Sequence, residues 1–354
     1  MEFVKSDRFL SLDIARGFAI FVMIEAHIAF ILLGSALNNL SGIVAAPFFI
    51  LISGLAFELF VVSRVRRENS KPKIFIESLS RSIVLFAITL LPYVIASIVM
   101  PSTFPWVGIL KWSVFQVIAV GYVIGFFLQG RQVLKIIALA LILFSTPLLS
   151  SIENLSFLIT GTFPLFPFLG FFITGQIFSD IYTNKRIEVI SSRNLLCISI
   201  LPLIILIPIL LLSNTVFGHD TLGQVHAFLI VCGAQFFFIV LFKVLVDRAK
   251  HIFIFRSLER IGRISFSAYY LHLAIIFTLA RAFSILNLAP SDIFIVLILN
   301  IVILLSITWV LSFIESKWSR YLYIFGVEWM FRKGSAIIAS LVESILQKAR
   351  KSRA

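Results

Sequence analysis

Residues 8–33 read RFLSLDIARGFAIFVMIEAHIAFILL, an apolar stretch as long as a membrane-spanning helix. Beyond Arg8 at its start, it nevertheless contains four ionisable side chains, Asp13, Arg16, Glu25 and His27. A charged side chain at the bilayer centre costs at least ~2.5–3.5 kcal/mol on insertion scales, so such residues face a protein interior or a wet cavity. The stretch therefore predicts a membrane helix that lines a site.

The rest of the chain has the composition of a polytopic membrane protein. Of its 354 residues 60% are hydrophobic and only 13% are charged, and the mean hydropathy is +1.06. The surface of a soluble domain needs far more charge. Apolar runs long enough to cross ~30 Å of hydrocarbon lie at 9–33, 43–62, 74–100, 107–128, 133–150, 164–181, 194–213, 223–246, 264–286 and 291–314. Because period-two alternation is absent, these runs predict an all-α bundle of ten transmembrane helices and not a β-barrel.

The basic residues predict the orientation of this bundle. Of the 30 Lys and Arg residues, 27 lie on alternate connections and on the two tails, and the intervening connections hold none. The positive-inside rule then places both termini in the cytoplasm of a multi-pass cell-membrane protein. Topology and anionic lipid headgroups account for the net charge of +13, so membrane lipid is an expected partner and nucleic acid is not.

The chain divides into a transmembrane domain over 1–324 and a basic amphipathic cytoplasmic tail over 325–354. Apolar residues recur in the tail at helical spacing, at Ile337, Ile338, Leu341, Val342, Ile345 and Leu346. Such a helix suits the membrane interface, as an anchor without chemistry. Cys197 and Cys232 have no ligand-like or disulfide-like spacing, so we expect neither a metal nor a bound cofactor.

Two polar positions of the first helix share one face. Asp13 and Arg16 are three residues apart and therefore neighbours, which also allows a simple ion pair. His27 lies eleven residues beyond Arg16, a rise of ~16 Å, and within about 20° of the same side. A neutral imidazole at that depth suits a general base; the alternative is a histidine that bonds a neighbouring helix for packing.

Polar residues also interrupt later segments. Gln116 lies in the fourth segment and is expected in a bundle interior or a cavity, whereas Glu58 lies near the inner end of the second, where it can extend to the interface. Prolines and glycines in FPLFPFLGFFITG (163–175) predict a bent start of the sixth segment. The ninth segment carries Tyr269 and His272, the latter either a second functional imidazole or a packing residue.

The R-x10-H pattern from Arg16 to His27 resembles the signature of acyltransferase family three, membrane enzymes that O-acylate glycans. Later stretches resemble the heparan-α-glucosaminide N-acetyltransferase catalytic family, and the tail FGVEWMFR (325–332) resembles a bacterial membrane family that ends in G-P-x-E-W. The similar stretches are PFFILISG (47–54), VFQVIAVGY (114–122), FPLFPFLG (163–170) and IGRISFSAYYLH (261–272).

These resemblances imply transfer of an acetyl or other short acyl group from cytoplasmic acyl-CoA, as co-substrate, to a glycan or amino-sugar acceptor. They imply His27 as the catalytic base and a pocket shaped by Asp13 and Arg16. Animal lysosomal members have Asn at the position of His27 and the essential His about three turns later. Asn38 stands there in this chain, and it joins the expected pocket with Gln116, Tyr269 and His272.

The phosphates of acyl-CoA are expected to meet basic cytoplasmic loops, at Arg64, Arg66, Arg67, Arg260 and Arg263. The sequence also leaves open a second copy of the chain, in a homodimer, as a partner. The rival interpretation is a transporter or flippase that uses the ionisable residues of the first helix as a relay, although transporters commonly show inverted repeats. A noncatalytic scaffold is the third.

Overall fold

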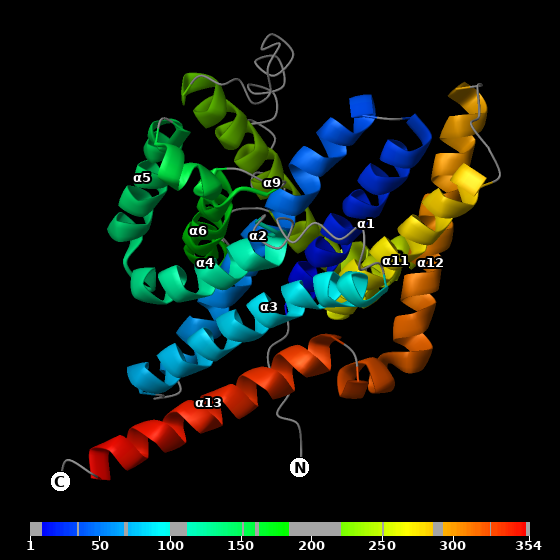
Figure 1. The fold of residues 1–354 in the computed structure, drawn as a ribbon. Coiled ribbons are helices and arrows are strands. Elements are labelled where there is room, and N and C mark those ends of the chain that lie inside the picture. The colour runs from blue at the N-terminus through cyan, green and yellow to red at the C-terminus, as the bar shows by residue number, and fades with distance from the viewer. Residues whose placement is uncertain are drawn as a thin grey trace. The chain divides into compact units, whose positions relative to one another are not determined.

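The computed structural model describes a helical protein, drawn with its helix labels in Figure 1. The described residues are 9–33, 35–66, 70–99, 112–150, 152–159, 163–183, 221–249, 251–285, 293–325 and 327–351. Within these ranges there are eleven α-helices, one short 3-10 helix and no strand. They form two compact units, and the helices α2 and α9 contribute to both.

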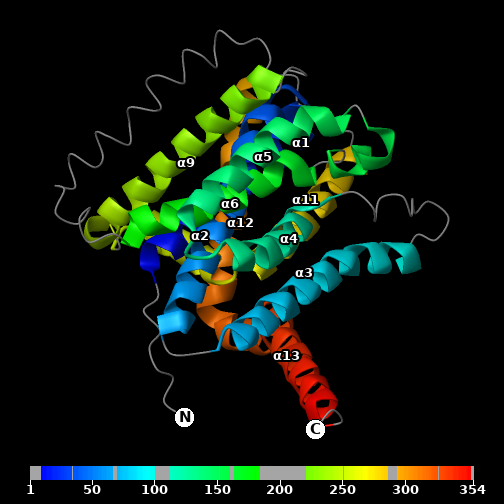
Figure 2. The same cartoon turned by 90° about the vertical axis from the view of Figure 1, so that its left-hand side faces the viewer.

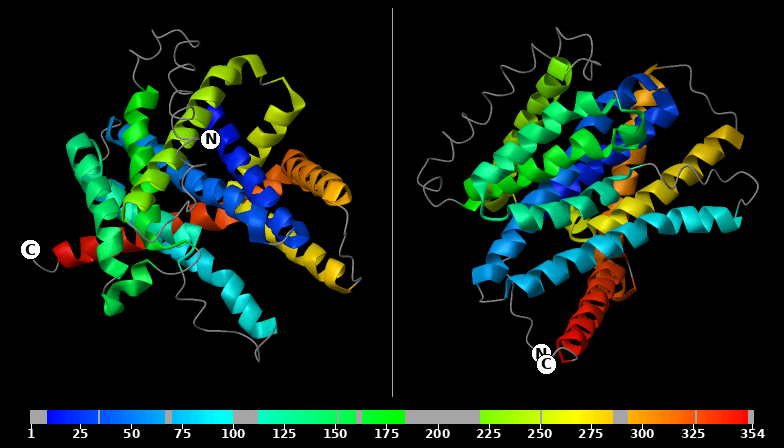
Figure 3. Two further views of the ribbon diagram at one scale, coloured as in Figure 1. Left: turned by 90° about the horizontal axis from the view of Figure 1, so that it is seen from above. Right: turned by 60° about the vertical axis from the view of Figure 1, so that its left-hand side comes forward.

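The first unit is built around the N-terminal helix. It contains α1 (Leu10–Leu33), the start of α2 (Ser35–Arg66) as far as Phe49, α9 (Thr221–Ala249) from Gly233 onward, α10 (Phe253–Arg263), α11 (Ser265–Ile285) and α12 (Ile293–Phe325). Within this unit α1 packs against α10, α11 and α12, and Figure 3 gives two further views of these helices. The helix with the ionisable residues therefore lies at the centre of its unit.

Two glycines allow α1 and α10 to cross at backbone contact. A Cβ on Gly262 would lie 1.8 Å from the carbonyl oxygen of Asp13, and a Cβ on Gly17 would lie 1.8 Å from that of Leu258. Neither position can hold a side chain without moving the helices apart. The two glycines therefore set the distance between α10 and the polar face of α1.

Replacing Gly262 by alanine is expected to destabilise the protein. The overpacking cost of about 1–3 kcal/mol exceeds the ~0.5–1 kcal/mol that alanine gains over glycine within a helix. A lower midpoint of thermal unfolding in detergent would show this. Gly334→Ala is the matched control, since its Cβ would lie 3.2 Å from a methyl group of Val84. Equal midpoints for the two variants would contradict the close crossing.

The second unit holds the remaining helices. They are the rest of α2, α3 (Lys71–Val99), α4 (Val114–Leu128), α5 (Gln132–Ser150), the 3-10 helix η2 (Glu153–Leu158), α6 (Leu165–Thr183), α9 as far as Cys232, and α13 (Val327–Lys351). In this unit α6 packs on α4 and α5, and α3 packs on α4 and α13 (Figure 2). The amphipathic tail predicted from the sequence is helical and lies against α3.

Nine of the ten predicted apolar segments coincide with helices, and the segment at 194–213 lies outside the described residues. The fourth begins later than predicted, because Ser113 forms a capping box with Gln116 and α4 starts at Val114. The ninth is preceded by the separate helix α10. The bent start of the sixth is confirmed, since Phe166 has the non-helical angles φ −104° and ψ 126°.

Two described helices are long and apolar enough to cross a membrane, by length and composition alone. They contain Ala45–Val65 of α2 and Ile298–Trp318 of α12. Large apolar side chains are also exposed along one face of α12, at Ile298, Ile301, Val302, Leu305, Trp309 and Phe313. A contiguous exposed apolar surface is typical of a membrane or protein contact.

Candidate active site in the first unit

The N-terminal part of the site is an ion pair on α1. The guanidinium Nη1 of Arg16 lies 3.5 Å from Oδ1 of Asp13, and the carboxylate side chain is 4% exposed whereas that of Arg16 is 28% exposed. The predicted pairing of these neighbours is therefore present. Because the backbone of Asp13 touches Gly262, the pair lies beside the crossing of α1 and α10.

Two histidines from distant parts of the chain meet in this unit. His27 of α1 and His272 of α11 lie with ring centroids 5.4 Å apart and planes at 68°. His272 is fully buried and His27 is partly buried. The break between α10 and α11 at Ile264 redirects the chain, so that α11 can bring His272 to α1.

The hydrogen bonds of the two rings define which nitrogen is available for chemistry. Nδ1 of His27 lies 2.6 Å from the carbonyl oxygen of Met23, and Nδ1 of His272 lies 3.0 Å from that of Ala268. A carbonyl oxygen only accepts, so each Nδ1 donates, and each neutral ring has its lone pair on Nε2. Nε2 of His272 is buried and has no hydrogen-bond partner among the described residues.

Such a nitrogen is an acceptor that lacks its donor. A buried polar atom without a partner costs free energy, so a hydroxyl, an amine or a water would be stabilised there. The ring of Tyr269, also on α11, lies with its centroid 5.5 Å from that of His272. The three rings thus form a polar cluster, which we call the histidine cluster (His27, Tyr269 and His272).

The basic residues of α10 differ from one another. Arg263 is ion-paired with Glu259 on its own helix, and its Nη1 lies 3.8 Å from Oε1 of Glu315 on α12. Arg260, one turn from the end of α10, has no ion pair among the described residues. Arg260 therefore has the free charge that an anionic ligand requires, whereas Arg263 is already neutralised by carboxylates.

The remaining predicted residues either have side chains outside the described part of the chain or belong to the second unit. Asn38 and Arg66 belong to α2, but their side chains lie outside what the structure describes, and so does Arg67 entirely. Gln116 belongs to the second unit, where its Oε1 accepts from the backbone N–H of Ser113 at 2.8 Å. Arg64 is also in the second unit, where its Nη1 lies 3.6 Å from Oε1 of Glu77.

The Arg16 to His27 spacing on α1 thus belongs to a site that also contains His272 of α11. A comparison with protein families matches most of the chain. Residues 9–314 match the acyltransferase domain that defines acyltransferase family three. The chain belongs to this family. No curated protein matches the sequence. Acyltransferase family three is membrane-associated, and the match supports the prediction of a membrane acyltransferase; it does not confirm the resemblance to the N-acetyltransferase family.

A second polar cluster, which was not predicted from the sequence, lies in the second unit. In the second unit Nζ of Lys135 lies 2.8 Å from Oε1 of Glu58, and Nε2 of Gln176 lies 2.8 Å from Oε2 of the same carboxylate. All three side chains are at most 1% exposed. Glu58 thus does not extend to the surface, and Lys135 lies inside α5.

Proposed function

We propose that this protein is a multi-pass membrane enzyme that transfers a short acyl group from cytoplasmic acyl-CoA to a glycan or amino-sugar acceptor, with His27 as the general base. The observation that carries the proposal is the histidine cluster. It places a histidine of the R-x10-H pattern beside a buried imidazole whose Nε2 lacks a donor. An acceptor hydroxyl or amine supplies that donor.

The proposed reaction needs one proton acceptor and one electrophile. Nε2 of His27 removes a proton from the acceptor hydroxyl or amine as the oxygen or nitrogen attacks the thioester carbonyl. The tetrahedral intermediate collapses, the carbon–sulfur bond breaks, and the thiolate of coenzyme A takes the proton back from the imidazolium. An ester or amide and the free thiol are the products, and no other reactant is required.

The other groups of the site have supporting roles in this proposal. The hydrogen bond from Nδ1 of His27 to Met23 orients the ring and stabilises the imidazolium that forms. His272 and Tyr269 position the acceptor through its remaining polar hydrogens. Arg260, which has no ion pair among the described residues, interacts with the phosphates of the donor, and Arg16 with Asp13 shapes the side of the pocket nearest α10.

Exposed apolar side chains are the observation that supports a membrane location in this proposal. Besides the two long apolar helices, α5 exposes large apolar residues that water would not tolerate as a continuous face, namely Val133, Ile136, Ile137, Leu141, Phe144 and Leu148. Lipid tails would cover such a face at no cost. The positive-inside pattern places both termini in the cytoplasm.

An acyl-transfer assay tests the proposal directly. Purified protein in liposomes is incubated with acetyl-CoA labelled on the acetyl group and with an amino sugar or an oligosaccharide. We expect labelled product and free thiol in equal amounts. Movement of a labelled sugar across the liposome membrane without release of thiol would contradict the proposal and favour a transporter. Absence of both thiol release and donor binding would favour a scaffold.

A further inference from the structure

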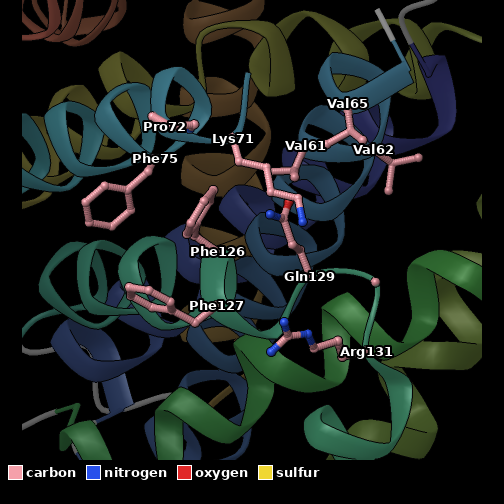
Figure 4. Close-up of a pocket in the computed structure, with 11 residues that line it drawn as sticks. Val61, Val62, Val65, Lys71, Pro72, Phe75, Phe126, Phe127, Gln129 and Arg131 are labelled. Atoms are coloured by element: carbon pink, nitrogen blue, oxygen red, sulfur yellow. The ribbon is translucent and has the colours of Figure 1, made fainter. Parts of the chain in front are cut away.

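The second unit contains a cavity of about 740 Å³ that the proposed function does not use. The end of α2, the start of α3 and the turn between α4 and α5 form its walls (Figure 4). Cavities of this size hold small molecules or parts of larger ones. The lining residues are Val61, Val62, Val65, Lys71, Pro72, Phe75, Phe126, Phe127, Gln129, Gly130 and Arg131.

The lining has two chemically distinct parts. Valine and phenylalanine side chains form an apolar wall, and Lys71, Gln129 and Arg131 supply the polar groups. Both cations are exposed, and neither has an ion-pair partner among the described residues. A ligand that matches both parts has an apolar chain and a compact anionic group.

A hydrogen bond to Glu58 holds the turn that carries the polar residues Gln129 and Arg131 of the cavity. The backbone N–H of Gly130 donates to Oε1 of Glu58 at 3.2 Å, and the same oxygen accepts from Nζ of Lys135. Gly130 has a φ of +66°, the left-handed conformation that glycine adopts at low cost. The buried carboxylate therefore fixes the backbone of the turn from which Arg131 extends.

We propose that this cavity binds one anionic phospholipid, with an acyl chain against the phenylalanine and valine wall and the headgroup phosphate between Lys71 and Arg131. The cavity lies where α2 ends and α3 begins, at the ends of apolar helices, which is the depth of lipid headgroups in the proposed membrane orientation. Two cations and one amide match a single phosphate. The several phosphates and the adenine of coenzyme A would need more polar groups than the lining supplies.

Lipid titrations of the purified protein in a neutral detergent test this assignment. We expect phosphatidylglycerol to raise the midpoint of thermal unfolding, whereas phosphatidylcholine and glycerol 3-phosphate leave it unchanged. In the double variant Lys71→Gln/Arg131→Gln, half-saturation requires about 25-fold more phosphatidylglycerol, because each cation contributes roughly a fivefold gain in affinity. The control Lys333→Gln/Lys348→Gln removes two exposed charges from α13 of the same unit and retains the response.

A second variant separates the cavity from its charges. Val65→Trp fills the apolar part and leaves both cations in place, so the response to phosphatidylglycerol should disappear while that of the α13 control variant persists. An equal response to phosphatidylcholine, or an unchanged titration of the double variant, would overturn the proposal. Stabilisation by palmitoyl-CoA without stabilisation by phosphatidylglycerol would overturn it too, and would assign the cavity to an acyl donor. None of these outcomes depends on activity at His27.

Discussion

Replacing His27 by alanine is expected to lower the rate of acyl transfer by roughly 10²–10⁴-fold, the contribution of a positioned general base. In the proposed mechanism the ring accepts the proton of the acceptor at Nε2 while Nδ1 remains hydrogen-bonded to the carbonyl oxygen of Met23. Alanine removes the base but leaves Arg260 and the α1–α10 crossing intact. The loss should therefore appear in kcat, and the KM for the acyl donor should change little.

The experiment measures initial rates of thiol release at saturating acceptor for three variants. His272→Ala should raise the KM for the acceptor more than it lowers kcat, because His272 positions the acceptor in this mechanism. His251→Ala is the control, since His251 is exposed and lies outside the histidine cluster. A His27→Ala variant with the rate of the unaltered protein would remove this residue from the mechanism.

The largest effect on stability is expected at the buried carboxylate of the second unit. Glu58→Gln leaves the ammonium of Lys135 without its counter-ion in a site that is 0% exposed, and such broken buried pairs cost about 3–5 kcal/mol. The variant also weakens the acceptor of Gly130 N–H and of Gln176 Nε2. We expect a much lower unfolding midpoint in detergent and poor accumulation in the membrane.

Two comparisons make this prediction specific. Glu77→Gln breaks the partly exposed pair with Arg64, which should cost only about 0–1 kcal/mol. The double variant Glu58→Gln/Lys135→Met removes both charges and should recover much of the stability, because the uncompensated charge is the main cost. If Glu58→Gln unfolds at the same temperature as Glu77→Gln, the buried pair does not stabilise the fold.

Much of the secondary structure could be predicted, because a helix in an apolar segment depends on local sequence. Segment length, proline positions and the charge pattern located nine helices and the bend at Phe166. Boundaries were less accurate where a cap decides them, as at Ser113. Gln116 was expected in a bundle interior or a cavity; its side chain is buried and takes part in this cap, a local hydrogen bond that hydropathy does not report.

The candidate site was predicted in part for a similar reason. Asp13, Arg16 and His27 share one helix, so their common face follows from helical geometry. Glu315, the partner of Arg263 on α12, was not predicted, because ion pairs between helices depend on which helices pack together. Lys135 could have been recognised, since an ionisable residue three positions into an apolar run is a candidate for a functional or paired role.

The sequence by itself determined the helices of the described residues, the R-x10-H spacing and membership of acyltransferase family three. Only the tertiary structure decided that His27 meets His272, and that Glu58 pairs with Lys135, 77 positions further along the chain, and with Gln176, 118 positions further. The physical reason is the separation along the chain of the residues that interact. Helix formation and periodic faces are properties of neighbouring residues, whereas each of these contacts requires two helices to approach, as Gly17 and Gly262 allow α1 and α10 to do.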